Sequence, residues 1–275
     1  MVKRFVHFAK WKIFQTRVKK GLSLLKQYDP FGYSIYLKLK DKTSFDGYIQ
    51  GADYFIKDVI PAIGTLGTAI HEILHGVDIE NSGYNVNKYY LIEGTFIQVE
   101  AQKYLPQRKI VYKNLNEEDK KDWDLSSKAD TYLQNFSGTM PFELLLEELN
   151  AYTIGANTVV NLAEGKGSPY ETGVVNPGII HMMRFMTLYL EELNSSKRGA
   201  YRKLKNNQQY TAVILKLWRQ AELVINRVCS SKKARFNTPE MDLKTLKRTY
   251  SSNAMESLNL LFHKKETFHM PEKCN

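Results

Sequence analysis

The sequence predicts an α+β protein in which a small N-terminal sheet packs against one amphipathic helix and a mainly helical part follows. Residues 33–40 alternate between apolar and polar side chains, which is typical of a strand. Residues 65–79 carry apolar side chains at helical spacing, and the patterns beyond residue 178 are mostly helical. A chain of 275 residues that is 43% hydrophobic and 25% charged has the composition of a globular protein and can bury a core.

The first residues are expected to form a helix and then a sheet. Residues 1–28 are basic and mostly helical in pattern, and the turn signal Asp-Pro-Phe-Gly at 29–32 ends this helix. The alternating stretch 33–40 is the first expected strand, and residues 47–56 are a second, shorter one. These two strands make up the predicted N-terminal sheet.

The clearest helical pattern covers residues 65–79. Its apolar stripe consists of Leu66, Ala69, Ile70, Ile73, Leu74 and Val77. Charged side chains then crowd the segment 106–130, above all at 116–122. This segment is therefore expected to be a solvated surface insertion.

A second long helix is expected over residues 140–163, because Pro141 suits a first helical turn. The loop at 165–178 contains several Gly and Pro residues and marks a boundary. We therefore expect a core unit over residues 1–165 and a helical C-terminal subdomain over 166–275. The helices of the second unit are predicted at 179–194, 199–230 and 240–262.

No segment is apolar for long enough to predict a transmembrane helix. Lys10 and Lys12 interrupt the apolar stretch near the N-terminus, so no signal peptide is expected, and the chain stays inside the cell unless a signal was removed beforehand. Cys229 and Cys274 form no recognisable motif. Two free thiols are expected in preference to a single bridge that would hold the C-terminal tail.

The net charge of +10 is unevenly distributed along the chain. Residues 1–50 carry +8, residues 51–160 carry −7 and residues 161–275 carry +9. This distribution is unlike a continuous basic face, so no nucleic-acid partner is expected, whereas the basic flanks favour an acidic partner. The glycine-rich phosphate loops and the serine-hydrolase motif are missing from the sequence, which excludes the common nucleotide-binding and serine-hydrolase functions.

The acidic segment 51–160 contains the motif His71-Glu72-Ile-Leu-His75, which lies within the clearest predicted helix. Histidines four residues apart project from one side of a helix, so both imidazoles can reach one metal ion. Glu72, next to the first histidine, can then accept a proton from activated water. The alternative is an amphipathic helix with two histidines at its polar edge.

A catalytic zinc ion needs a third protein ligand, and the helix at 140–163 offers two adjacent acids. On a helical wheel Glu147 lies opposite the core stripe, together with Glu143 and Asn150, and should be solvated. Glu148 lies at the edge of the stripe, on the same flank as Gly155, where small residues let another helix approach. Glu148 is therefore preferred as the ligand, with Glu147 as the alternative.

This pattern resembles the gluzincin branch of the zinc metallopeptidases, which have two histidines of an HExxH motif and a glutamate from a later helix. Asp78, three residues after the second histidine, gives some resemblance to lethal-factor-like metalloprotease domains. The resemblance covers only residues 64–83 and 139–157. Related enzymes often carry an acid four residues after the third ligand, where this chain has Tyr152.

The resemblance implies a zincin-like fold and a zinc metalloendopeptidase acting on a peptide or protein substrate. It implies one Zn²⁺ per chain, held by His71, His75 and Glu148, with Glu72 as the general base. Tyr152 is the preferred donor to the oxyanion.

Further roles are left open by the sequence. Tyr170 and His181 are alternatives to Tyr152 as oxyanion donor, and Asp78 and Asn81 could orient a histidine ligand. Two other functions remain as alternatives. One is a catalytically inactive scaffold of the same fold, and the other is a basic helical binding module in which the histidine motif is coincidental.

Overall fold

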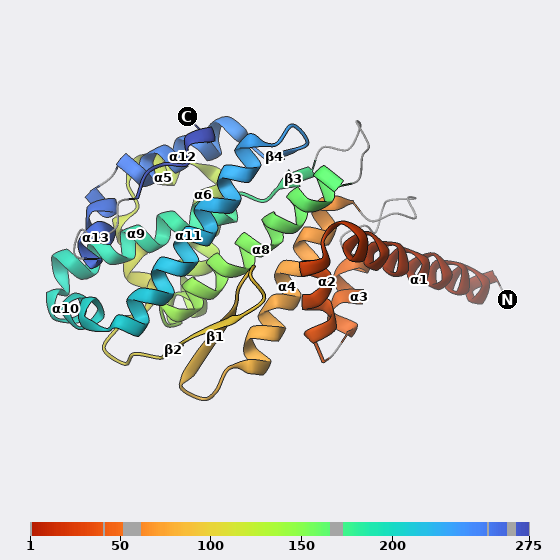
Figure 1. Cartoon of the computed structure of the whole chain (residues 1–275), viewed down its shortest axis with the longest axis horizontal. Coiled ribbons are helices and arrows are strands. Elements are labelled where there is room, and N and C mark those ends of the chain that lie inside the picture. Colours follow the sequence, from red (N-terminus) through yellow and green to blue (C-terminus); the bar gives the residue numbers. More distant parts are fainter. Residues whose placement is uncertain are drawn as a thin grey trace.

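The computed structural model describes residues 2–40, 42–51, 62–165, 173–251, 253–262 and 268–274, and it is mainly helical (Figure 1). The α-helices are α1 Val2–Tyr28, α2 Pro30–Lys38, α3 Thr43–Gly51, α4 Ile63–Asn81, α5 Glu117–Lys121, α6 Trp123–Leu133, α7 Asn135–Gly138, α8 Glu143–Gly165, α9 Gly178–Ser196, α10 Arg198–Asn206, α11 Gln208–Ser230, α12 Pro239–Ser251 and α13 Asn253–Leu261. The strands and 3₁₀ helices are β1 Val86–Tyr90, β2 Phe96–Glu100, β3 Gly173–Val175, β4 Ala234–Phe236, η1 Arg108–Asn114 and η2 Glu272–Cys274.

The prediction of an N-terminal sheet is wrong, because the described residues of both expected strands are mainly helical. Residues 33–38 belong to α2 and residues 47–51 to α3, while residues 52–56 lie outside the described part. Ile35 in α2 and Leu39, which caps this helix, are both buried and four residues apart, and Leu37 between them is 58% exposed. The burial period is therefore helical, although the letters alternate. Pro30 stands in the first turn of α2, where its missing N–H is tolerated.

Strands occur instead after α4, before α9 and after α11. β1 and β2 form an antiparallel hairpin in which Val86 pairs with Glu100 and Tyr90 with Phe96. β3 and β4 form a short parallel pair that joins the segment before α9 to the segment after α11. The α+β class is compatible with this arrangement, with the sheets placed differently from the prediction.

The central layer consists of α4, α8 and α11, which lie side by side in that order (Figure 1). α4 and α8 carry the two long helical patterns of the sequence, and both helices are confirmed. They approach closely at Gly67 and Gly155: a Cβ atom on Gly155 would lie 2.8 Å from the Gly67 carbonyl oxygen. This contact requires glycine on both helices.

The segment 106–130 is not a solvated insertion. It forms η1, α5 and most of α6, which pack against α9 and one another. Asp119 is fully buried and accepts a hydrogen bond of 2.8 Å from Arg184 Nη2. Asp122 caps α6 through the backbone N–H of Leu125. Residues 116–122 therefore cap two helices and supply a partner for the buried Arg184, and several of them also face solvent.

The three predicted C-terminal helical patterns correspond to α9, to α10 with α11, and to α12 with α13, and the second pattern is interrupted at Asn207. The predicted units 1–165 and 166–275 are in contact, since α8 packs against both α9 and α11. Within the described residues, no helix has both the length and the apolarity that a membrane span requires.

The expectation of two free thiols is wrong, because Cys229 and Cys274 form a disulfide. The tail folds back so that η2 packs against α11, which brings the two Cα atoms to 5.3 Å. Phe268 is buried in the same tail and packs edge-on against Trp218. Tertiary packing thus joins two cysteines that are 45 residues apart in the sequence.

Candidate metal centre

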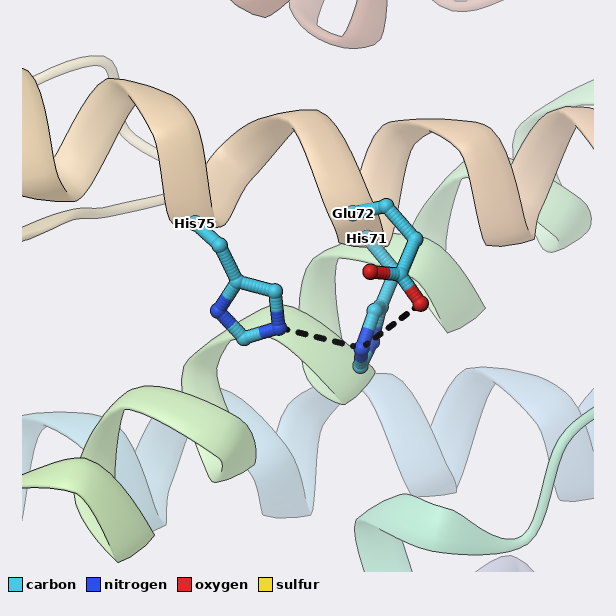
Figure 2. A group of neighbouring side chains, drawn as sticks. All are labelled: His71, Glu72 and His75. Carbon is cyan, nitrogen blue, oxygen red and sulfur yellow. Dashed lines mark hydrogen bonds and ion pairs between the residues drawn. The ribbon is translucent and has the colours of Figure 1, made fainter. Parts of the chain in front are cut away.

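α4 presents the two histidines of the motif on one side, one turn apart. Figure 2 shows both imidazole rings and the Glu72 carboxylate leaving the helix together. The Nε2 atoms of His71 and His75 are 3.3 Å apart, and His71 Nε2 lies 3.9 Å from Glu72 Oε1. The three side chains form a group that could hold a metal ion.

Glu148 reaches the same point from the facing helix, α8. Its Oε2 atom lies 3.8 Å from the Nε2 atom of each histidine. That oxygen is buried and has no hydrogen-bond partner among the described residues. A buried carboxylate oxygen without a partner is costly, so this position favours a cation between the two helices.

The three atoms fit zinc as a donor set. Tetrahedral ligands at about 2.1 Å from zinc lie about 3.4 Å from one another, and the observed separations are 3.3, 3.8 and 3.8 Å. Imidazole nitrogens and a carboxylate oxygen are ligands of catalytic zinc sites, in which three protein ligands leave one position open.

Each histidine also has a second partner, separate from the neighbours of its Nε2 atom. His75 Nδ1 lies 3.0 Å from Glu147 Oε1, and His71 makes a hydrogen bond with the backbone of Ala151. Metal-ligating histidines nearly always have such a second partner, which fixes the orientation of the ring. The structure thus brings both acids of α8 to the site, Glu148 facing the two Nε2 atoms and Glu147 bonding to the back of His75.

The expectation that Glu147, Glu143 and Asn150 are solvated is wrong. The Glu147 side chain is only 12% exposed, and the other two residues are fully or nearly fully buried. α8 packs against α4, α9, α11 and β1, so it has no solvent-facing side around residues 143–150. A helical wheel assumes one buried stripe, and a helix surrounded by neighbours does not satisfy that assumption.

The acids and histidines determine one another's protonation. Burial and the neighbouring charges of His75 and Lys128 lower the pKa of His71 to about 3. Burial also opposes the charged form of His75, but Glu147, Glu148 and Glu72 outweigh it and raise the pKa to about 9. Burial raises the pKa of Glu148. Three carboxylates surround two histidines, so the field of the site attracts a cation.

Glu72 differs from Glu148 in its surroundings. Its side chain is 32% exposed and lines a cavity with a volume of about 520 Å³. Tyr48 of α3 donates a hydrogen bond of 3.1 Å to Glu72 Oε2, and this bond orients the carboxylate. Glu72 can therefore exchange protons with a molecule in the cavity, whereas Glu148 lies outside the lining.

The cavity lies beside the histidines and is lined by elements from across the chain. Its described lining consists of Gly64, Gly67, Thr68, His71, Glu72, Lys128, Tyr132, Tyr152, Gly155, Ala156, Val159, Val174, Asn176, Pro177 and Asn237. The ring of Tyr152 packs 4.3 Å from that of His71, and its hydroxyl lies 3.0 Å from that of Tyr132. Tyr152 thus contacts His71 and also lines the cavity, as a donor to a bound carbonyl would.

The other described candidates, His181, Asp78 and Asn81, do not reach the site. His181 is fully buried outside the cavity lining, and Tyr170 lies outside the described residues. Asp78 accepts a hydrogen bond from the backbone of Tyr90, and Asn81 donates to the carbonyl of Val77. Glu147, and not Asp78 or Asn81, orients a histidine.

Sequence reasoning missed Tyr48, Lys128 and Tyr132. Lys128 and Tyr132 are one turn apart on α6, a spacing that puts both on one side of the helix. This spacing indicates that the two side chains lie together, but it does not show which cavity that side of α6 faces. Tyr48 carried no signal among 17 tyrosines.

Comparison with protein-family models, curated proteins and solved structures finds no match to this chain. The chemistry of the site is therefore inferred from its geometry and from the residues themselves.

Proposed function

We propose that this protein is a zinc-dependent metallopeptidase in which His71, His75 and Glu148 hold one zinc ion per chain. The observation that carries the proposal is the convergence of three donor atoms at 3.3–3.8 Å. The buried Glu148 oxygen without a partner supports a cation at this point. Two histidines at a helix edge would not require a carboxylate oxygen from another helix to lie beside both of them.

The two functional glutamates have different roles in this proposal. Glu148 is a ligand because its Oε2 atom is buried between the helices, and Glu72 is the general base because it lines the cavity. The hydrogen bond from Tyr48 leaves the other Glu72 oxygen for a water molecule in the cavity. A base must lie within hydrogen-bond reach of the proton that it removes.

The zinc ion would supply a Lewis acid that activates water and polarises a carbonyl group. Glu72 takes the proton of the attacking water and delivers it to the leaving amine when the peptide bond breaks. The hydroxyl of Tyr152 donates a hydrogen bond to the carbonyl oxygen as negative charge develops there. The lining groups of Thr68, Asn176 and Asn237 can bond to the peptide backbone.

The proposal predicts that Glu72→Gln abolishes turnover and preserves zinc binding. We expect kcat on a mixed peptide library to fall roughly 100- to 10,000-fold, because the base is lost while the three ligands remain. Glu80→Gln is the matched control, since Glu80 lies on the same helix but outside the cavity lining. Cleavage is followed by mass spectrometry, with zinc content measured in parallel.

The alternatives give different results. Zinc binding without cleavage of any peptide by the wild-type protein would favour an inactive scaffold. No zinc binding, together with strongly salt-dependent binding of nucleic acid or lipid, would favour the basic helical module. Unchanged turnover in Glu72→Gln would contradict the assigned base.

A further inference from the structure

Lys128 brings a positive charge into the cavity beside the proposed zinc site. It lies on α6, and its Nζ atom donates a hydrogen bond of 2.5 Å to the Tyr152 hydroxyl. It is the one Lys or Arg among the described lining residues. Among the ion pairs of the described residues none involves Lys128, so no carboxylate neutralises it there.

The surroundings of Lys128 hold the ammonium group in place without neutralising it. Nζ lies 4.9 Å from the ring centroid of Tyr152 and 5.7 Å from that of Tyr132. Cation–π contacts and one hydroxyl satisfy part of the ammonium group, which has three donors. Its remaining capacity is available to an acceptor that enters the cavity.

Lys128 is also badly placed to be a structural counter-ion. The positive groups whose charges act on Glu148 are His75 and Arg108, and both lie outside the described cavity lining. The charge of Lys128 instead reaches His71, whose ring packs against that of Tyr152. One tyrosine ring therefore separates the ammonium group from the histidine cluster.

We propose that Lys128 selects substrates that carry a carboxylate close to the scissile peptide bond. This inference rests on the proposed function, because it places the reacting carbonyl at His71 and Glu72. A carboxylate pairs strongly with an ammonium group in a partly dehydrated cavity. Two sources offer this group: the side chain of an acidic residue and the free C-terminus of a peptide.

The test compares matched peptides that differ in one charge. One pair has blocked termini and carries Glu or Gln at each position in turn, and a second pair has neutral side chains and a free or amidated C-terminus. We expect the wild-type kcat/KM to be about tenfold higher for the carboxylate member of one pair, equivalent to about 1.4 kcal/mol. The pair that shows the preference identifies the source.

Two Lys128 variants and a control make the test specific. Lys128→Met should reduce the carboxylate preference from about tenfold to about onefold. Lys128→Glu should reverse it, so that a Lys-containing peptide is preferred over its Gln counterpart, which a misfolded protein would not do. Lys120→Met is the control, because Lys120 is exposed on α5 and pairs with Glu117.

Equal preference in wild type and Lys128→Met would overturn the inference, as would the same loss of kcat/KM for every peptide. Failure of the proposed peptidase function can be distinguished from failure of the proposed carboxylate recognition. If the wild-type protein cleaves nothing, fluorescein-labelled Glu and Gln peptides are titrated with wild type and Lys128→Met, and binding is followed by fluorescence anisotropy. Tighter binding of the Glu peptide that disappears in Lys128→Met supports carboxylate recognition without catalysis, and equal binding rejects it.

Discussion

Each histidine of the cluster is held at two points, which fixes the direction of its Nε2 atom. His75 lies between Glu147 and His71, and His71 lies between the Ala151 backbone and the ring of Tyr152. Orientation by such outer partners preorganises a metal site, because little conformational entropy is then lost on binding. At the scale of single residues, the site therefore depends on Glu147 in addition to the motif.

His181 should make the folded protein sensitive to acid. It is fully buried, and neither ring nitrogen has a hydrogen-bond partner among the described residues. Burial, reinforced by the charges of Lys128 and Arg248 and opposed by that of Asp122, lowers its pKa to about 4. An unfolded histidine titrates near pH 6.5. The unfolded chain therefore takes up the proton first, and the free energy of unfolding falls as the pH drops from about 6.5 towards 4.

The variant His181→Leu removes this titration and fills a similar volume. Between pH 8 and pH 5 the wild-type protein should lose roughly 2 kcal/mol more of its free energy of unfolding than the variant. Urea unfolding at the two pH values measures the difference. Equal losses in both proteins would show that His181 is not a buried neutral group.

The motif residues could be predicted from sequence because their spacing alone places them on one side of a helix. The position of Glu148 beside the histidines could also be predicted, since the small residues on its flank of the helix indicate a closely packed neighbouring helix. The low exposure of Glu147 could not be predicted, because the solvation of a residue on α8 depends on every element that packs around this helix. Lys128 reaches the cavity through the packing of α6, and no local pattern specifies that packing.

At the scale of elements, the contact between α4 and α8 sets the distance between the histidines and Glu148. A Cβ atom on Gly155 would lie 2.8 Å from the Gly67 carbonyl oxygen and 3.1 Å from His71 Cβ. Two backbones cannot yield as a flexible side chain can, so the helices would have to move apart. The close approach is thus a condition for the donor geometry.

We expect Gly155→Ala to destabilise the protein by about 1–3 kcal/mol, through overpacking, and to weaken zinc binding at least tenfold. Gly199→Ala is the control, because no atom lies within 4 Å of its added Cβ and alanine favours a helix. Thermal unfolding and zinc titration measure both effects. If Gly155→Ala bound zinc as tightly as wild type, the helix contact would not control the site.

The elements were predictable where burial follows one simple period. α4 and α8 have long apolar stripes, and both were found. The alternating letters of α2 predict a strand, whereas its buried positions, Gly32, Ile35 and Leu39, are three and four residues apart and Leu37 is exposed. The acidic run at 116–122 was judged by composition, which does not show that Arg184 would supply a buried partner for Asp119.

At the scale of the whole molecule, the disulfide joins the C-terminal tail to α11 across 45 residues. Closing a loop of that length in the unfolded chain is worth about 4 kcal/mol in the chain-entropy model. Cys274→Ser should therefore lower the free energy of unfolding by up to that amount, measured in urea. Adding a reductant should destabilise the wild type and leave the variant unchanged, whereas an equal effect on both would argue against the bond.

The charge distribution of the whole chain agrees with the proposed site. The segment 51–160, with a net charge of −7, supplies the proposed ligands and the general base, and basic segments precede and follow it. A negative field favours a metal cation, and positive flanks favour an acidic substrate. The preference proposed for Lys128 has the same sign.

The central claim is that three side chains from two helices hold one zinc ion. The most direct test is zinc stoichiometry of wild type, Glu148→Ala and Glu147→Ala by elemental analysis after dialysis against zinc. We predict one zinc per chain in wild type, loss of zinc in Glu148→Ala, and binding weakened roughly 10- to 100-fold in Glu147→Ala, which loses only the partner of His75. A wild-type protein without zinc, or full zinc retention in Glu148→Ala, would contradict the account.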